Sequence, residues 1–265
     1  MKMHSLRTHL VRAFSAPTLY LCSVVYALLL TISSLGRNSV MQISNGLQFG
    51  HIVGFNMILS AVLPALAYAV TYVDDYTTRL LYVWVVRTGA RRYAISYYTA
   101  ALIAGFCVSL MGNCLYIIIM LLRGCPFESG STVGSITFHT YESWYLNGWT
   151  ALYIITVLME YALGAAAMSG IAAVCSSLFH QRFSALCIPV MCFFLFDILS
   201  MVVTVFPELG WSIHPMLNPN QLTQVSSYFD TPVLNLIYKM LTAAVYFVVC
   251  GGITAYTIER SVENV

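Results

Sequence analysis

Six long apolar stretches, separated by shorter polar segments, dominate the hydrophobic pattern of the chain. They cover residues 18–35, 51–73, 94–122, 149–177, 185–206 and 233–258. About 20 helical residues cross a bilayer core of about 30 Å, so each stretch is long enough for one pass. Backbone groups in lipid must be hydrogen-bonded within their own segment, which favours helices. The pattern predicts an all-α membrane protein with six transmembrane helices in a single domain, residues 1–265.

The segment before the first pass has a helical pattern of its own. Within residues 2–15, one face is mostly apolar and another is polar and basic. The apolar set is Met3, Leu6, Leu10, Ala13 and Phe14, and the polar set is Ser5, Thr8, His9 and Arg12. A basic amphipathic helix of this kind lies in the membrane interface. Pro17 suits the first turn of the following pass. The alternative is a signal peptide cleaved near residues 33–36.

Basic residues indicate how the passes are oriented. Nine of the 12 Lys and Arg residues fall on one side of the predicted passes: Lys2, Arg7, Arg12, Arg79, Arg87, Arg91, Arg92, Arg182 and Arg260. Arg37 and Arg123 lie in the opposite loops. Lys239 lies just inside the opposite end of the sixth pass, where its side chain can reach the interface. The positive-inside rule therefore predicts a multi-pass protein of the cell membrane with both termini in the cytoplasm.

The polar segment between the second and third passes is unusually long for a simple connection. It runs over residues 74–93 and contains four arginines. Wound as a helix, it places one apolar arc where it could rest on the bilayer: Thr77, Leu80, Leu81, Trp84 and Val85. The opposite arc mixes basic and apolar residues: Arg79, Tyr82, Val83, Val86 and Arg87. An apolar patch that faces the cytosol marks a protein contact, and the charges around it would set the register. The alternative is an interfacial helix that only fixes the topology.

Composition and motifs exclude several function classes. Hydrophobic residues make up 59% of the chain and charged residues 8%, against roughly 25% charged in a soluble domain. The net charge of +2 gives no reason to expect nucleic acid as a partner. No phosphate-binding loop, HExxH or Gly-x-Ser-x-Gly motif is present, so the chain is not expected to be an enzyme or to bind a cofactor. His139 and Glu142 could share a helical face, but two ligands do not make a metal site.

Two acidic residues lie inside predicted passes, Glu160 and Asp197. Each costs on the order of 3 kcal/mol at the centre of a membrane helix, so such residues are functional candidates. One interpretation places them on a translocation path or proton relay, together with tyrosines such as Tyr97 and Tyr153. The other is a hydrogen-bonded acid that holds helices together through Lys239, Tyr153 or Asn113. Both interpretations stay open.

Two motifs resemble a known family. Residues 75–81 (DYTTRLL) and 87–93 (RTGARRY) are similar to the pattern of bacterial ABC-2-type transporter permeases. In that pattern an acidic residue, a Gly-Thr-like pair, a hydrophobic helix and a small-residue–Arg element precede the third pass. Thr77 stands where Gly is common, and Tyr97 lies near where a Lys often begins the third pass. Short peptide-exporting and lantibiotic-immunity permeases are similar in size.

The resemblance implies a coupling helix that docks on a separate ATPase subunit, which would bind ATP and Mg. The implied contacts are Asp75, Arg79, Tyr82, Val83, Trp84, Val86, Arg87, Arg91 and Arg92. It also implies a second permease, identical or related, and export of an amphipathic substrate such as an antimicrobial peptide, a lipid-like molecule or a drug. The residues alone leave two other classes open: a proton-coupled secondary transporter that uses Asp197 and Glu160, and a non-transporting membrane sensor or assembly protein.

Overall fold

The structure is a computed structural model that describes residues 4–35, 43, 47, 55–125, 141–205 and 231–263. For residues 4, 35, 55–61, 142, 146, 193 and 196–205 it describes the backbone but not the side chains. In this part of the chain every regular element is a helix. The predicted all-α class is therefore confirmed for the described residues.

Four helices are long and apolar enough to cross a membrane. They are α2 (Pro17–Leu35), α7 (Ala90–Leu122), α9 (Thr150–Phe179) and α14 (Pro232–Glu263). They coincide with the predicted first, third, fourth and sixth passes, and they indicate a membrane-embedded protein. Parts of the second and fifth stretches lie in α4 (Phe55–Tyr68) and α10 (Arg182–Val205). That these two also cross the membrane, giving six passes, stays a prediction.

The predicted second pass is interrupted. A continuous helix was expected over 51–73, but α4 ends at Tyr68 and α5 covers Thr71–Thr77. The carbonyl oxygen of Ala69 accepts hydrogen bonds from the hydroxyls of Tyr97 and Ser176. The amide of Val73, which a continuous α-helix would pair with that oxygen, donates instead to the carbonyl of Val70 at 3.0 Å. At the break, the Ala69 carbonyl oxygen is therefore hydrogen-bonded by side chains of α7 and α9 instead of by a backbone amide.

The segment between the second and third passes is two helices rather than one. α5 is separated from α6 (Leu80–Thr88) by Thr78 and Arg79. Arg79 has a φ of 59°, in the left-handed region, which is uncommon for a residue with a side chain. The hydroxyl and amide of Thr78 both donate to the carbonyl of Asp74, at 2.6 and 3.0 Å, and close the end of α5. Local side-chain hydrogen bonding of this kind competes with helix continuation.

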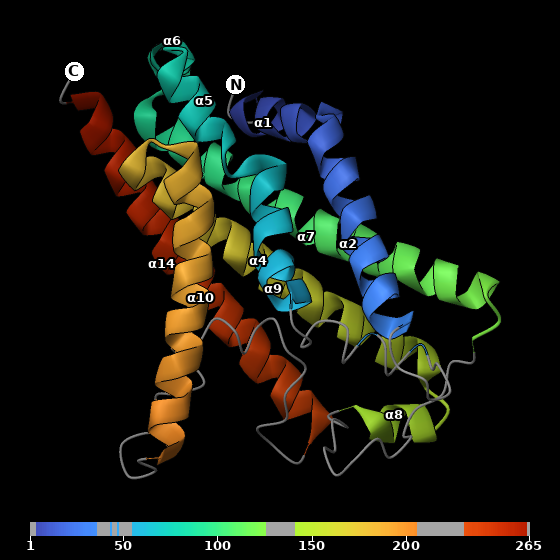
Figure 1. The fold of residues 1–265 in the computed structure, drawn as a ribbon. Helices are drawn as coiled ribbons and strands as arrows, with labels where there is room; N and C mark the ends of the chain where they lie inside the picture. Colours follow the sequence, from blue (N-terminus) through green and yellow to red (C-terminus); the bar gives the residue numbers. More distant parts are fainter. Residues whose placement is uncertain are drawn as a thin grey trace.

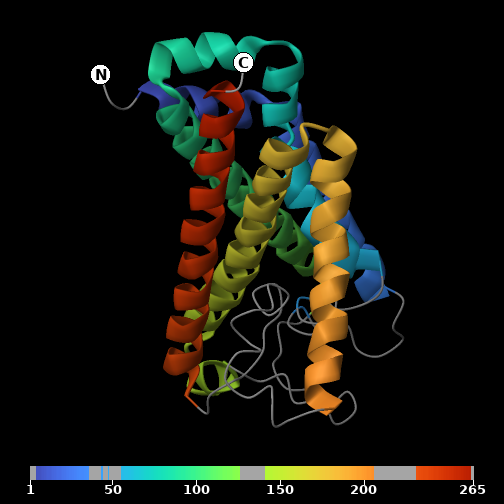
Figure 2. The ribbon, with the colours of Figure 1, turned by 90° about the vertical axis from the view of Figure 1, so that its left-hand side faces the viewer.

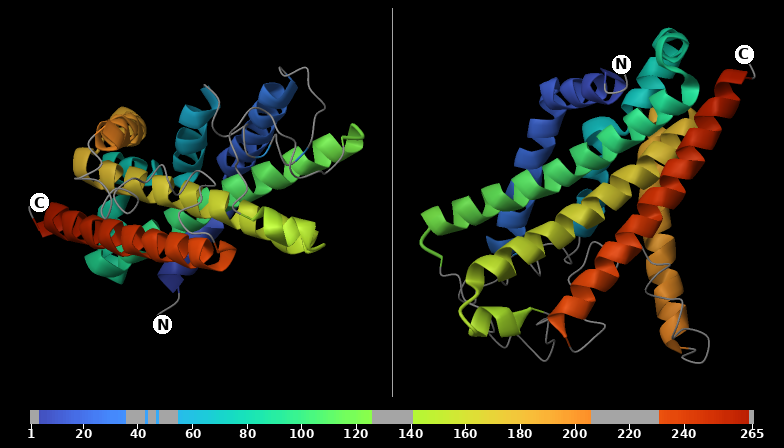
Figure 3. Two further views of the ribbon diagram at one scale, coloured as in Figure 1. Left: turned by 90° about the horizontal axis from the view of Figure 1, so that it is seen from below. Right: turned by 180° about the vertical axis from the view of Figure 1, so that it is seen from behind.

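α7 and α9 form the centre of the bundle, and α2, α4, α10 and α14 pack around them (Figure 1). Seen from behind, α7, α9 and α14 run side by side (Figure 3). α7 and α9 meet through small residues: a Cβ on Gly105 would lie 2.6 Å from the Cβ of Ser169. The hydroxyl of Ser169 also donates to the carbonyl of Ala101 at 2.8 Å. Close approach through small residues is how helices pack where lipid supplies no hydrophobic drive.

The two ends of the bundle differ in character. α1 (His4–Ser15), α5, α6, the turn between α9 and α10, and the last turns of α14 gather at one end, whereas α8 (Glu142–Leu146) lies at the other (Figure 2). Eight of the nine basic residues that define the predicted cytoplasmic side are described, and all belong to elements or helix ends gathered at the first end. The orientation of this end relative to a membrane stays a prediction.

Candidate functional site

α6 turns one face toward the protein and the other outward. Leu81 is fully buried, and the Trp84 ring packs 6.3 Å from the ring of His9 on α1. On the outer face, Val83 is 47% exposed and Val86 is 87% exposed, and Arg87 is exposed beside them. The mixed apolar and basic face at the end of the bundle is therefore accessible. We call Val83, Val86 and Arg87 the outer face of α6.

The apolar arc predicted to rest on the bilayer is divided. Leu81, Trp84 and Val85 pack against the core of the protein, whereas Leu80 is 45% exposed and Thr77 is exposed. The reason is the break after α5, because Thr77 and Leu80 no longer lie on one continuous helix. The division leaves the outer face of α6 accessible, together with the exposed residues at the turn before it.

The remaining residues of the implied ATPase contact differ in exposure. Arg79, Arg91 and Arg92 are exposed, and Tyr82 is half-buried. Asp75 is fully buried, so its carboxylate contacts the protein's own side chains rather than an outer surface.

Asp75 is the centre of a buried polar cluster that joins three helices. The Nη1 atom of Arg12 on α1 lies 2.7 Å from Oδ1 and 2.8 Å from Oδ2 of Asp75. The hydroxyl of Tyr93 on α7 donates to Oδ2 at 2.8 Å. Burial alone would lower the pKa of Arg12, but the hydrogen bond and charge of Asp75 raise it above the ordinary value. The cluster ties α5 to α1 and to the first turns of α7.

His9 lies beside this cluster as a neutral group. Its Nδ1 atom is 2.7 Å from the hydroxyl of Tyr68, and its ring lies 5.0 Å from that of Tyr93. The pKa of His9 is lowered to about 4: burial has the largest effect and lowers it, the Asp75 charge raises it, and the Arg12 charge lowers it. The amphipathic pattern had placed His9 and Arg12 on a polar outer face. The structure turns both toward the protein, because Asp75 and Tyr68 supply buried polar partners there.

α5 is also fastened on its other side, to the turn between α9 and α10. The Nε atom of Arg182 donates to Oδ1 of Asp74 at 2.7 Å. The ring of His180, at the end of α9, lies 4.1 Å from the ring of Tyr76, tilted by 43°. Adjacent carboxylates thus connect α5 to opposite neighbours: Asp75 reaches α1 and α7, and Asp74 reaches α10.

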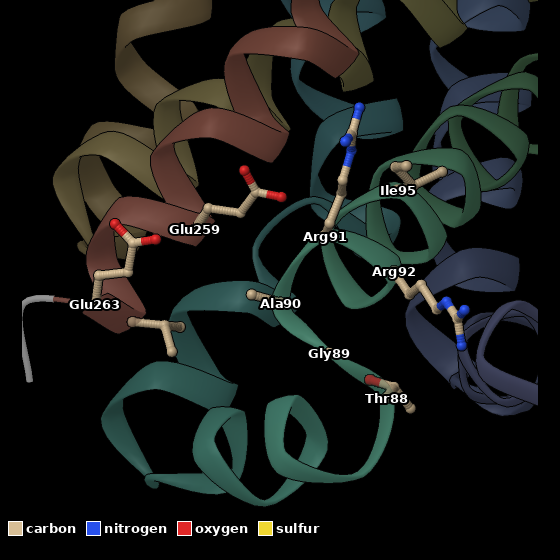
Figure 4. A pocket seen from close by; sticks show the side chains of 9 residues that line it. Thr88, Gly89, Ala90, Arg91, Arg92, Ile95, Glu259 and Glu263 are labelled. Carbon is tan, nitrogen blue, oxygen red and sulfur yellow. The ribbon is translucent and has the colours of Figure 1, made fainter.

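A groove of about 550 Å³ opens where α6 meets α7. Its lining comes from the turn between these helices, the start of α7 and the end of α14: Thr88, Gly89, Ala90, Arg91, Arg92, Ile95, Glu259, Val262 and Glu263 (Figure 4). Gly89, with a φ of 84°, forms the one-residue connection between α6 and α7. Arg91 of α7 lies on the side of the groove opposite Glu259 and Glu263 of α14, whereas Arg92 points away from these acids (Figure 4).

Of the two acids predicted inside the membrane, the structure describes the side chain of Glu160 only. Glu160 on α9 pairs with Lys239 on α14, with the Nζ atom 2.8 Å from Oε2, and the hydroxyl of Tyr141 donates to Oε1. Both charged side chains are buried, so the prediction that Lys239 reaches the interface is wrong; the carboxylate of Glu160 draws it inward instead. Of the partners considered for Glu160, the structure selects Lys239. The side chain of Asp197 lies outside the described part.

The tyrosines proposed for a translocation path are engaged in packing. The hydroxyl of Tyr97 donates to the Ala69 carbonyl at the break between α4 and α5. Tyr153 is 4% exposed, and its ring lies 5.9 Å from that of Tyr145 near the α8 end. His139 and the side chain of Glu142 lie outside the described part. Among the described residues, no group of three or more His, Cys, Asp or Glu is placed to hold a metal ion.

Sequence reasoning missed the ion pairs Arg12–Asp75 and Asp74–Arg182. The partners are 63 and 108 residues apart, so no local spacing connects them. One signal was present: His9 and Arg12 are three residues apart and therefore share a helical face.

Comparisons with known proteins find no relative for this arrangement. The chain matches no family model, no curated protein and no solved structure. Its function therefore has to be argued from its own residues and geometry.

Proposed function

We propose that the chain is the membrane-spanning permease subunit of an ATP-driven exporter in the cell membrane, with both termini in the cytoplasm and six passes. A separate ATPase subunit would bind ATP and Mg and dock on the outer face of α6. The expected cargo is an amphipathic molecule, and the expected assembly pairs two permeases with two ATPase subunits. The proposal rests on the resemblance of residues 75–81 and 87–93 to ABC-2-type permeases and on the geometry of α6.

One observation carries the proposal: α6 is accessible on one face and anchored on the other. Val86 is 87% exposed, while Leu81 in the same helix is fully buried. Val83, Val86 and Arg87 together form an exposed apolar patch bordered by a charge, and such patches mark protein contacts. The buried Asp75 cluster and the Asp74–Arg182 pair connect the adjoining α5 to α1, α7 and α10. A force applied to the outer face would thus reach the bundle through polar contacts and through the Gly89 connection.

The alternatives receive less support. A proton-coupled transporter would need Glu160 to exchange protons, but both of its carboxylate oxygens have partners, Lys239 and Tyr141. A non-transporting sensor or assembly protein would also present a docking face, and the experiment below separates it from a permease.

The test is a charge and polarity change on the outer face of α6. The double variant Val86→Asp, Arg87→Glu, purified from membranes of its native host, is expected to retain at most one-tenth of the ATPase activity that copurifies with the wild-type chain. Vanadate-sensitive export in membrane vesicles is expected to fall with it. For a sensor or assembly protein, the double variant would lose the ATPase, but the wild type would show no vanadate-sensitive export.

Arg123→Glu is the matched control. Arg123 is exposed at the far end of α7 and undergoes the same charge reversal. This variant is expected to retain the ATPase. Full association in the double variant, or equal loss in both variants, would refute docking at α6.

A further inference from the structure

Tyr98 occupies an unusual position where α7, α9 and α14 meet. Its ring lies between two glycines of different helices: a Cβ on Gly251 of α14 would lie 3.0 Å from its Cε1 atom, and a Cβ on Gly170 of α9 would lie 2.9 Å from its hydroxyl oxygen. Tyr98 is 5% exposed. Any residue other than glycine at these two positions would fill the space that the ring occupies. The three helices run side by side (Figure 3).

The hydroxyl of Tyr98 has no hydrogen-bond partner among the described residues. Buried polar groups in proteins are almost always hydrogen-bonded. Two other buried tyrosine hydroxyls with the same property have a serine close by, Ser261 for Tyr72 and Ser34 for Tyr116. For Tyr98 the neighbouring group is the Cys250 thiol on α14, which forms no hydrogen bond with it.

A phenylalanine would fill the same space without an unmet hydroxyl, so this conformation alone gives no physical reason for a tyrosine. Separation of the helices would admit a polar partner and restore the hydrogen bond of this hydroxyl. α14 is the helix best placed to move, because a smaller share of its apolar span is buried than in α7 or α9. Among the described residues, its contact with α9 and α7 includes the ion pair Glu160–Lys239, the hydroxyl contact Ser177–Thr257 at 2.7 Å, glycine contacts such as Gly251, and a small apolar cluster around Ala167 and Ala243.

We propose that the contact of Tyr98 with Gly170 and Gly251 opens to form a binding site, in which the Tyr98 hydroxyl donates to a hydrogen-bond acceptor on an amphipathic ligand. The ligand class is an apolar chain with a carbonyl or ether oxygen, which fits a slot with apolar walls and one donor. The inference rests on the proposed export function for the identity of the ligand as cargo. The opening itself is independent of any ATPase.

Cys250 is a native reporter for this opening. All eight cysteines are free, so seven can be replaced to leave Cys250 alone in the full-length chain, reconstituted in lipid nanodiscs. A charged methanethiosulfonate reacts with thiols in contact with water. We expect measurable labelling of Cys250 in this protein. In the Tyr98→Phe variant we expect labelling to be about five-fold slower or more, because removal of the hydroxyl stabilises only the closed contact.

Tyr246→Phe is the matched control, since Tyr246 lies one turn before Cys250 on α14 and loses the same hydroxyl group. Labelling in this variant is expected to match that of the parent. Absence of labelling in the parent, or an unchanged or faster rate in Tyr98→Phe, would overturn the proposed opening.

The ligand class is tested with two probes of similar size. Methyl dodecanoate carries a carbonyl acceptor and tetradecane carries none. The ester is expected to slow labelling of Cys250 at least two-fold more than the alkane does, and Tyr98→Phe is expected to abolish the difference. Equal effects of the two probes in the parent would overturn the acceptor site. Because these measurements use the permease alone, their failure is distinguishable from a failure of ATPase docking at α6.

Discussion

Arg12 and Asp75 form an ion pair across 63 residues of sequence, and only one of the two charges can reach water. The side chain of Arg12 is 36% exposed, whereas that of Asp75 is 1% exposed. The pair joins α1 to α5, and Tyr93 adds α7. Because the two side chains are buried to different extents, replacing one should change the free energy of unfolding by a different amount than replacing the other.

Loss of Arg12 should cost more than loss of Asp75. Arg12→Gln leaves a buried carboxylate with Tyr93 as its remaining partner, and an uncompensated buried charge costs about 3–5 kcal/mol. Asp75→Asn leaves a guanidinium that can hydrate, so its cost should be smaller. The difference is measured as thermal unfolding midpoints of purified protein in detergent.

Arg182→Gln provides the comparison for that experiment. The Arg182 and Asp74 side chains are 68% and 37% exposed, so breaking their pair should cost about 1 kcal/mol or less. Equal midpoints for Arg12→Gln and Arg182→Gln would contradict the assignment of a buried cluster at Asp75.

Acidification should weaken the fold through His9. Because burial lowers the pKa of His9 to about 4 in the native protein, the unfolded chain, with a pKa near 6.5, binds more protons between these values. Stability should therefore be complete above about pH 6.5 and should fall as the pH drops toward 4, by up to about 3 kcal/mol.

The measurement is the unfolding midpoint at pH 7 and pH 5 for the wild type and for His9→Gln. The glutamine variant should lose less stability between the two values. Identical pH dependence in both proteins would show that His9 is not the titrating group.

Gly105 should not tolerate a methyl group, whereas Gly252 should. A Cβ on Gly105 would lie 2.6 Å from the Cβ of Ser169 and 3.0 Å from the carbonyl oxygen of Ala165, so α7 and α9 would have to separate. Gly105→Ala should destabilise by about 1–3 kcal/mol. A Cβ on Gly252 meets nothing within 4 Å, and Gly252→Ala should be neutral or stabilise α14 by up to about 1 kcal/mol. Thermal unfolding of both variants checks the ranking, and the reverse order would mean that α7 and α9 are not packed in this way.

The Glu160–Lys239 pair should show strong non-additivity. Glu160→Met leaves the Lys239 ammonium buried without its counter-charge and should destabilise by about 3–5 kcal/mol. The double variant Glu160→Met, Lys239→Met should recover most of that loss, because apolar residues of similar length can replace a buried pair. A double-mutant cycle on unfolding midpoints measures the coupling; additive losses would mean that the two side chains do not interact.

The sequence pattern located the long helices but not the contacts between them. The stretches 94–122 and 149–177 lie almost entirely within α7 and α9, because bilayer thickness fixes both the length and the apolarity of such helices. The breaks at Ala69 and Arg79 were not predictable, because the first depends on hydroxyls of Tyr97 and Ser176 that are distant in sequence. For the candidate site, periodicity identified the exposure of Val83, Val86 and Arg87. It could not show that Asp75 is buried, since its partner Arg12 comes from another helix.

The single-residue connection at Gly89 makes α7 a lever arm for whatever touches α6. α7 has 33 residues, which gives it a length of about 50 Å at 1.5 Å per residue. If its α6 end is displaced so that the helix tilts by about 5°, its opposite tip swings by about 4 Å over that length. A small rotation of α7 at its α6 end would therefore displace its opposite end by about the length of a side chain.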